Sequence, residues 1–160
     1  MTPDLSYRMR AARLDDAPLI AHHRVAMFRD MRILDAREAG PLESASCEYL
    51  TAALSRGDYF GWLVERAGRV VGGAGLSLRP VLPRPGVLRS SDEAYLMNVY
   101  VDPAYRRRGV ARALVVAMLD WCRDRGVTRV TLHASDEGRP LYEAFGFAST
   151  NEMRLEWVDP

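Results

Sequence analysis

The stretch YRRRGVARAL, residues 105–114, is the part of the sequence that says most about the fold. Arg106, Arg107 and Arg108 stand directly before Gly109 and an apolar run with helical spacing. The N-terminal end of a helix already carries positive charge from its aligned peptide dipoles, so added cations are unfavourable there unless an anion binds. The stretch therefore indicates either an anion site at a helix start or a solvated cluster of arginines.

The residues on either side predict a strand before this stretch and a helix after it. EAYLMNVYV at residues 93–101 is almost continuously apolar, as is typical of a central strand covered on both faces, and Pro103 ends it. From Gly109, apolar residues recur at helical spacing until Gly126. Because Gly109 allows close approach to the backbone and first-turn N–H groups have no helical partner, this unit suits a phosphate or pyrophosphate.

Further elements are predicted on both sides of that unit. Asp15, Asp16 and Pro18 supply cap and first-turn chemistry for a helix reaching about residue 29. An irregular proline-rich connection is predicted at residues 79–91. The other predictions are strands at 7–11, 127–134 and 153–157, a hairpin at 59–78 with its turn at 66–69, and helices at about 42–55 and 136–145. Together they predict one α+β domain with helices packed on a mixed sheet.

Composition limits the classes of partner. Basic and acidic residues number 22 and 21, so the net charge of +1 suggests neither a nucleic acid nor a membrane surface as partner. Cys47 and Cys122 are far apart, and we interpret both as core thiols. His22 and His23 are adjacent and would diverge on a helix, so no metal site is expected. The first residues lack an apolar signal core, which predicts a cytoplasmic location.

Three motifs in order resemble the GCN5-related N-acetyltransferases. VDPAYRRRGVARAL is similar to their acetyl-coenzyme A signature, [RQ]xxGx[GA], and NVYV looks like their fourth strand. LHASDEGRPLYEAFGF resembles their fifth strand, the gap after it and a helix with a tyrosine before a Gly-Phe pair. With VVGGAGL, the resemblance covers roughly residues 59–150. It implies the acyl-CoA N-acyltransferase fold: three layers with a mixed, mostly antiparallel sheet whose fourth and fifth strands splay apart.

The resemblance implies acetyl-coenzyme A as cosubstrate and no metal. The backbone of residues 107–111 would wrap the pyrophosphate, so that the cations and the helix start share one anion. Val99 and Val101 would pair with the pantetheine arm as an added strand would. The coenzyme residues expected on this basis are Val99, Val101, Arg106, Arg107, Arg108, Gly109, Val110 and Ala111.

The resemblance also implies catalytic roles. Tyr142 matches the tyrosine that donates a hydrogen bond or proton to the coenzyme sulfur, or it could be a core aromatic residue whose hydroxyl reaches a backbone partner. The N–H of Val99 is the candidate donor to the acetyl oxygen. The position where some members carry a basic glutamate falls on Tyr95, a departure from the family pattern. Glu93 could act as base through a water, or it could be the solvated start of its strand.

The sequence says less about which residues would bind the amine acceptor. The resemblance points to Phe28, Met31 and the segment 82–87, although Phe28 and Met31 could also be core residues on one helix face. Asn98 could hold a strand bulge or orient substrate. Asp30 and Glu48 could attract a cationic amine or face water, and Ser135 and Asp136 could cap a helix or touch the coenzyme.

The expected function is direct transfer of an acetyl group from acetyl-coenzyme A to a primary amine of a small molecule or peptide. No covalent acetyl-enzyme is expected, since neither cysteine is at a matching position. The alternatives are a non-catalytic acyl-coenzyme A sensor of the same fold and a nucleic-acid module using the arginines. Net charge argues against the second, and a homodimer is possible.

Overall fold

The computed structural model describes residues 6–159 and contains a five-stranded sheet. Its strands follow one another in sequence order: β1 (Arg8–Ala11), β2 (Tyr59–Arg66), β3 (Arg69–Val81), β4 (Ser91–Val101) and β5 (Arg129–Leu132). The pairs from β1 to β4 are antiparallel, whereas β4 and β5 are parallel. The predicted mixed, mostly antiparallel sheet is confirmed, as is the hairpin turn between β2 and β3.

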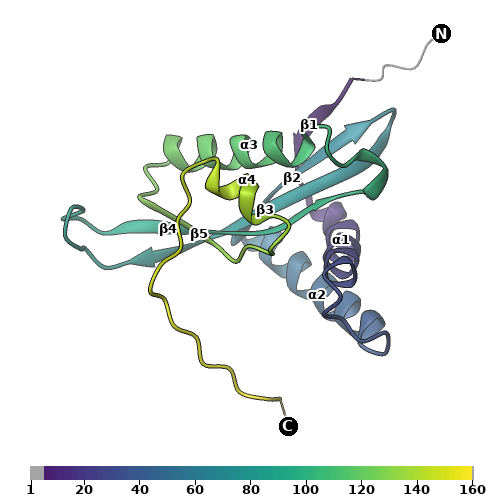
Figure 1. Cartoon of the computed structure of the whole chain (residues 1–160), viewed down its shortest axis with the longest axis horizontal. Coiled ribbons are helices and arrows are strands. Elements are labelled where there is room, and N and C mark those ends of the chain that lie inside the picture. Colours follow the sequence, from purple (N-terminus) through teal and green to yellow (C-terminus); the bar gives the residue numbers. More distant parts are fainter. Residues whose placement is uncertain (1–5, 160) are drawn as a thin grey trace.

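Helices cover both faces of this sheet, as predicted (Figure 1). On one face lie α1 (Ala17–Asp30) and α2 (Ala39–Arg56), which pack with Leu63 of β2. On the other lies α3 (Val110–Asp124), which buries Leu114 and Met118 against Leu76 of β3. The short α4 (Arg139–Glu143) packs on the same side as α3. None of the helices within residues 6–159 combines the length and apolarity needed to cross a membrane.

The fourth and fifth strands separate at one end. Residues 93–96 of β4 pair with β5, but β4 continues to Val101. Over residues 97–101, β4 has no β5 partner in the described part of the chain. The predicted splay is therefore confirmed, and it leaves a strand edge open beside the start of α3 (Figure 1).

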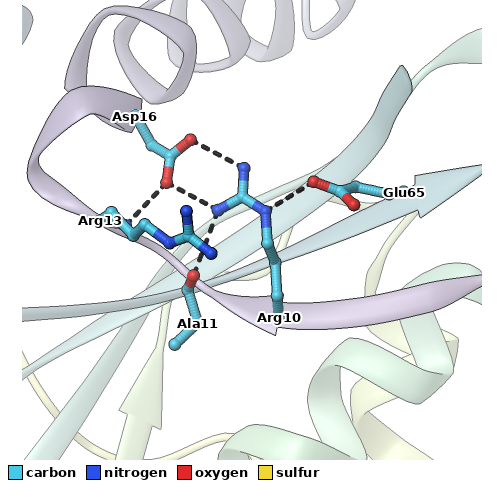
Figure 2. A network of polar contacts seen from close by, with 5 residues as sticks. All are labelled: Arg10, Ala11, Arg13, Asp16 and Glu65. Carbon is cyan, nitrogen blue, oxygen red and sulfur yellow. Dashed lines mark hydrogen bonds and ion pairs between the residues drawn. The ribbon is translucent and has the colours of Figure 1, made fainter. Parts of the chain in front are cut away.

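A polar network joins the N-terminal strand to α1 (Figure 2). The Arg10 guanidinium donates to both carboxylate oxygens of Asp16, at 2.8 and 2.9 Å, and its Nε donates to Glu65 at 2.6 Å. These hydrogen bonds from Arg10 hold the pKa of Asp16 below its usual value. Asp16 occupies the N-cap position of α1 and Pro18 lies in its first turn, as predicted. The Asp16 carboxylate makes no hydrogen bond to that helix, because it accepts from Arg10 and from the backbone N–H of Arg13.

The proline-rich connection is shorter than predicted. β3 runs through Pro80 to Val81, and Val81 pairs with Ser91 at the start of β4. The ladder extends this far because Arg79 and Glu93 pair across the two strands. The hairpin end is anchored by Arg84, which donates to the carbonyl of Thr128 in the α3–β5 connection. Segment 82–87 thus lies at the end of the sheet away from α1 and α2 (Figure 1).

The predicted last strand, residues 153–157, is wrong. After β5, the described residues contain no further strand, and Met153, Leu155 and Trp157 are 93%, 75% and 86% exposed. Alternating residues favour an extended segment, but a strand also needs a hydrogen-bonded neighbour, and this segment has none within residues 6–159. The predicted helix 136–145 and strand 127–134 are confirmed with narrower limits.

Candidate active site

A bulge interrupts β4 at Asn98. Gly75 of β3 pairs with Met97, and Gly73 pairs with Tyr100, so β4 carries one residue more than β3 across this interval. Asn98 has a φ of 56°, in the left-handed region that asparagine tolerates better than most residues. The extra residue breaks the strict alternation of the strand, as bulges do. Met97 and Asn98 both face α1 and α2, while Val99 packs on the side of α3.

Asn98 also joins two other elements. Its Oδ1 accepts a hydrogen bond from Nη1 of Arg24 at 2.8 Å, and its Nδ2 donates to the hydroxyl of Tyr59 at 3.2 Å. Asn98 is 6% exposed and Tyr59 is 3% exposed. Burial raises the pKa of Tyr59 to about 12, so its hydroxyl stays protonated at neutral pH. Asn98 therefore lies at a strand bulge, which confirms the first of the two roles considered for it. It also lines a cavity.

This cavity lies between α1, α2 and β4 and has a volume of about 370 Å³. Among the predicted acceptor residues, Asn98 lines it, while Phe28 and Met31 are not in the described lining. Phe28 stacks on the Arg24 guanidinium, 4.6 Å from the ring centroid, and Met31 is 40% exposed near the end of α1. The full lining is Arg24, Leu42, Ala45, Ser46, Tyr49, Leu50, Met97 and Asn98.

Sequence reasoning missed most of this lining. The residues come from three segments far apart in the chain, and each has an ordinary place in its own element. Arg24 has the appearance of a surface arginine on α1, and Tyr49 is 60% exposed on α2. The one signal in the sequence was Asn98, a polar residue inside an apolar strand.

The arginine segment forms a tight turn into α3. Arg107 has a φ of 58° and Gly109 a φ of 83°, and Gly109 is the residue before the first turn of the helix. The backbone N–H groups of residues 107–112 donate no hydrogen bond to any residue between 6 and 159. Arg107, Arg108 and Gly109 are exposed, and Val110 is buried against the sheet. The turn thus presents a row of free donors, two guanidinium groups and the positive end of a helix dipole.

Arg106 differs from its two neighbours. Its Nε donates to the carbonyl of Val101 at 2.9 Å, and its guanidinium forms an ion pair with Asp30 at the end of α1. Arg106 therefore connects the α3 turn to the opposite layer of the molecule. Asp30, in turn, has its carboxylate paired with a cation of the protein itself.

Glu93 is a buried carboxylate that pairs with two half-exposed arginines. It is 2% exposed, and its Oε1 accepts from Arg79 at 2.8 Å and from the Thr131 hydroxyl at 3.2 Å. Arg129 lies 3.7 Å from its other oxygen. Burial would raise the pKa of Glu93, but Arg79, Thr131 and Arg129 outweigh burial and lower that pKa. The interpretation of Glu93 as a solvated strand start is wrong, and its ion pairs make it a weak base.

Tyr95 follows on the same face, and its hydroxyl lies 2.5 Å from Nδ1 of His133, just beyond β5. This pair was not predicted. Residues 93 and 95 of β4 pair with residues 129 and 131 of β5. Because side chains alternate along a strand, residues 131 and 133 lie on the same face, and Glu93 and Tyr95 each contact the residue two positions beyond their own partner. The hydrogen bond fixes the orientation of an exposed imidazole beside the splay.

Tyr142 lies on α4 and packs against the apolar cluster beneath α3. Its ring meets Phe147 edge to face, with centroids 5.9 Å apart. Burial raises the pKa of its hydroxyl. Within residues 6–159 that hydroxyl has no hydrogen-bond partner, unlike a core tyrosine bound to the backbone. Ser135 Oγ accepts from the N–H of Gly138 at 3.1 Å, so Ser135 has the capping contact proposed for it.

Comparison with known proteins agrees with this geometry. The profile of the Acetyltransferase (GNAT) family matches residues 25–147. The glucosamine 6-phosphate N-acetyltransferase of Trypanosoma brucei brucei is 31% identical over 144 residues, which is 89% of this chain and 82% of that protein. The chain belongs to the GNAT family of acetyltransferases.

Solved structures show the same architecture. A GCN5-related N-acetyltransferase from Ralstonia eutropha JMP134 is 33% identical and superposes with a TM-score of 0.87 over 95% of this chain and 99% of that one. A predicted acetyltransferase from Clostridium acetobutylicum, solved with acetyl-coenzyme A, superposes with a TM-score of 0.84 over 96% of each chain at 22% identity. The second likeness concerns the fold. The acyl-CoA N-acyltransferase fold expected from the sequence is confirmed.

Proposed function

We propose that the protein transfers the acetyl group of acetyl-coenzyme A directly to a primary amine. The observation that carries this proposal is the row of unpartnered N–H groups at residues 107–112, where α3 begins. Together with the exposed guanidinium groups of Arg107 and Arg108, these donors suit a pyrophosphate. Gly109, Val110 and Ala111 would contribute backbone N–H groups, while Arg106 would hold the turn in place.

The pantetheine arm would lie along the open edge of β4. Residues 97–101 continue past the end of β5, so their backbone groups on this side have no strand partner, although the carbonyl of Val101 already accepts from Nε of Arg106. Val99 and Val101 are the residues we assign to this contact. The bulge at Asn98 directly precedes Val99 and borders the cavity between α1, α2 and β4. A thioester held at Val99 would therefore lie next to this cavity.

The reaction forms a carbon–nitrogen bond and breaks the carbon–sulfur bond of the thioester. The N–H of Val99 would donate to the carbonyl oxygen as negative charge develops on it. Tyr142, whose raised pKa keeps it protonated, would give its proton to the departing sulfur. The amine proton would pass to solvent or, through a water, to Glu93. The ion pairs that lower the pKa of Glu93 make solvent the stronger candidate.

The cavity is the proposed acceptor site, with Asn98 as an orienting group. Phe28 and Met31 stay predictions, because Phe28 reaches the site only through Arg24. The Trypanosoma relative is named for glucosamine 6-phosphate, which is one amine to test as acceptor. The cytoplasmic location, the single domain, the possible homodimer and the expected lack of nucleic-acid and membrane partners also stay predictions.

Thermal unfolding with and without acetyl-coenzyme A tests the proposal, with ATP and NAD as controls. At 100 times the dissociation constant, binding adds about 2.7 kcal/mol of stability, which raises the midpoint by roughly 5–10 °C for a chain of this size. A shift no larger than that with ATP would contradict the coenzyme site. A selective shift without thiol release for any amine would instead indicate an acyl-coenzyme A sensor.

A further inference from the structure

The cavity at the β4 bulge contains one charged side chain, Arg24, and that charge is uncompensated. Within residues 6–159, no carboxylate forms an ion pair with Arg24. Asp30, at the end of the same helix, pairs with Arg106, and Glu43 of α2 lies 3.4 Å from His22. A cation without a counter-ion attracts an anion and repels a cationic ligand. The acceptor site therefore disfavours polyamines and other multiply cationic amines.

The guanidinium of Arg24 is held in one orientation. Nη1 donates to Asn98, and the guanidinium plane lies over the ring of Phe28. The Nε–Nη2 edge donates to no acceptor among the described residues. Two parallel N–H groups on one edge match the two oxygens of a carboxylate, which they bind in a bidentate manner. The arrangement is thus preorganised for a carboxylate.

The rest of the cavity is mainly apolar. Leu42, Ala45, Leu50 and Met97 provide apolar walls. The other polar residues of the lining are Ser46, which is 8% exposed, Tyr49 and Asn98. A sugar would leave several hydroxyl groups without partners against these walls, at a cost for each buried group. An apolar side chain would instead gain by burial there. The volume of about 370 Å³ is near the lower end for ligand sites, which run from roughly 300 to 1,000 Å³.

We infer that the acceptor is an apolar α-amino acid, with its carboxylate on Arg24, its side chain among Leu42, Ala45, Leu50 and Met97, and its amine toward Val99. This inference rests on the proposed function, because it takes the cavity beside Val99 as the acceptor site. It makes Arg24 a specificity-determining residue. It also separates this acceptor from a peptide N-terminus, whose first residue has no free carboxylate.

Leucine and leucinamide form the matched pair that tests this inference. They share the amine and the side chain, and only leucine carries a carboxylate. Binding of each is measured by calorimetry in the presence of coenzyme A, and acetyl transfer is followed as thiol release. A charged hydrogen-bonded pair is worth roughly 1.5–3 kcal/mol, so leucine should bind about 10- to 100-fold more tightly than leucinamide. An amino sugar phosphate and spermidine should be poorer acceptors than leucine.

Variants of Arg24 test whether this residue causes the preference for leucine over leucinamide. In Arg24→Gln the ratio of the affinities for leucine and leucinamide should fall close to one. Arg24→Lys keeps the positive charge but lacks the edge with two parallel N–H donors, so it should retain part of the preference for leucine. Arg29→Gln changes an exposed arginine on the same helix and should retain the full preference. The thermal shift with acetyl-coenzyme A, measured on every variant, shows that the fold and the coenzyme site are intact.

The outcomes separate this inference from the proposed function. If the wild-type protein gives no selective shift with acetyl-coenzyme A, the proposed function fails, and the inference fails with it. If the coenzyme binds but leucine binds no better than leucinamide, or neither binds, the inference alone is overturned. An amino sugar phosphate that binds more tightly than leucine would also overturn it, because Arg24 would then serve a phosphate.

Discussion

The ring of Tyr59 fills the space directly above Gly75, so that a Cβ on Gly75 would lie 1.9 Å from the tyrosine hydroxyl oxygen. That hydroxyl accepts the hydrogen bond from Asn98 at the β4 bulge. Two adjacent strands are therefore coupled to the bulge through one buried ring. The absence of a Cβ at residue 75 is a steric requirement of this arrangement.

Gly75→Ala should destabilise the protein by about 1–3 kcal/mol, because the ring must move within a packed core. Denaturant unfolding measures the change. Gly40→Ala is the control, since a Cβ there would meet nothing within 4 Å and the residue lies in α2. That substitution should be neutral or stabilising by up to about 1 kcal/mol. Equal stability of the two variants would contradict the coupling of Gly75 to Tyr59.

Glu93→Gln tests whether Glu93 is a base as well as an ion-pair partner. Loss of the buried carboxylate leaves Arg79 with a weaker acceptor, so the free energy of unfolding should fall by about 1–3 kcal/mol. If Glu93 is also the base, kcat of the folded variant should drop by about 100-fold or more. Asp92→Asn, at the exposed neighbour, should change neither quantity. An unchanged kcat in folded Glu93→Gln rules out the base role.

Tyr142→Phe should lower kcat by about 100-fold while leaving the free energy of unfolding within about 0.5 kcal/mol of wild type. The stability expectation follows because the hydroxyl has no partner within residues 6–159. Stopped-flow or steady-state thiol release gives the rate, and denaturant titration gives the stability. Full activity in this variant would remove Tyr142 from the mechanism.

Gly109→Glu and Gly109→Gln isolate the effect of a negative charge at the α3 turn. Both place a side chain at a φ of 83°, which costs roughly 1–2 kcal/mol in either case. A Cβ at Gly109 meets no atom within 4 Å, so both variants should fold. Only the glutamate side chain repels the negatively charged pyrophosphate. The Gly109→Glu variant should therefore bind coenzyme A at least about tenfold more weakly than the Gly109→Gln variant, as measured by calorimetry. Equal affinities would contradict pyrophosphate binding at this turn.

His23 predicts a decline in stability at mildly acidic pH. It is 7% exposed, and burial lowers its pKa from 6.5 to about 4, with a smaller contribution from His22. Below pH 6.5 the unfolded chain takes up a proton that the folded protein binds only near pH 4, so stability falls as the pH falls through this window. The slope should approach but not exceed about 1.4 kcal/mol per pH unit.

Unfolding of wild type and His23→Gln between pH 7 and pH 4 checks this prediction. The wild-type curve should decline across the window, and the variant curve should be flatter, whatever its stability at pH 7. Asp16 and Glu93, whose lowered pKa values add a further loss at lower pH, are present in both proteins. Parallel curves would show that His23 does not cause the decline.

The strand–turn–helix unit proposed to bind the coenzyme could be predicted from sequence because its parts are contiguous. The strand, the arginine turn and α3 follow one another within residues 91–124, and local rules for glycine, proline and helix starts apply to each. The cavity proposed as the acceptor site could not be predicted, because Arg24, Tyr49 and Met97 meet only after two helices pack on the sheet. Glu93 was misjudged for a similar reason, since Arg79 and Arg129 belong to neighbouring strands.

The sequence-ordered sheet also has a consequence for how the protein folds. β2, β3 and β4 form a meander whose contacts are close in sequence, whereas β5 reaches β4 only after the α3 crossover, and β1 reaches β2 only across α1 and α2. Closing the longer loops is slower, so we expect the meander to order first. The bulge at Asn98 would then form before the turn at residues 106–109. In kinetic terms, β4 would be in place before α3 and β5 pack against it.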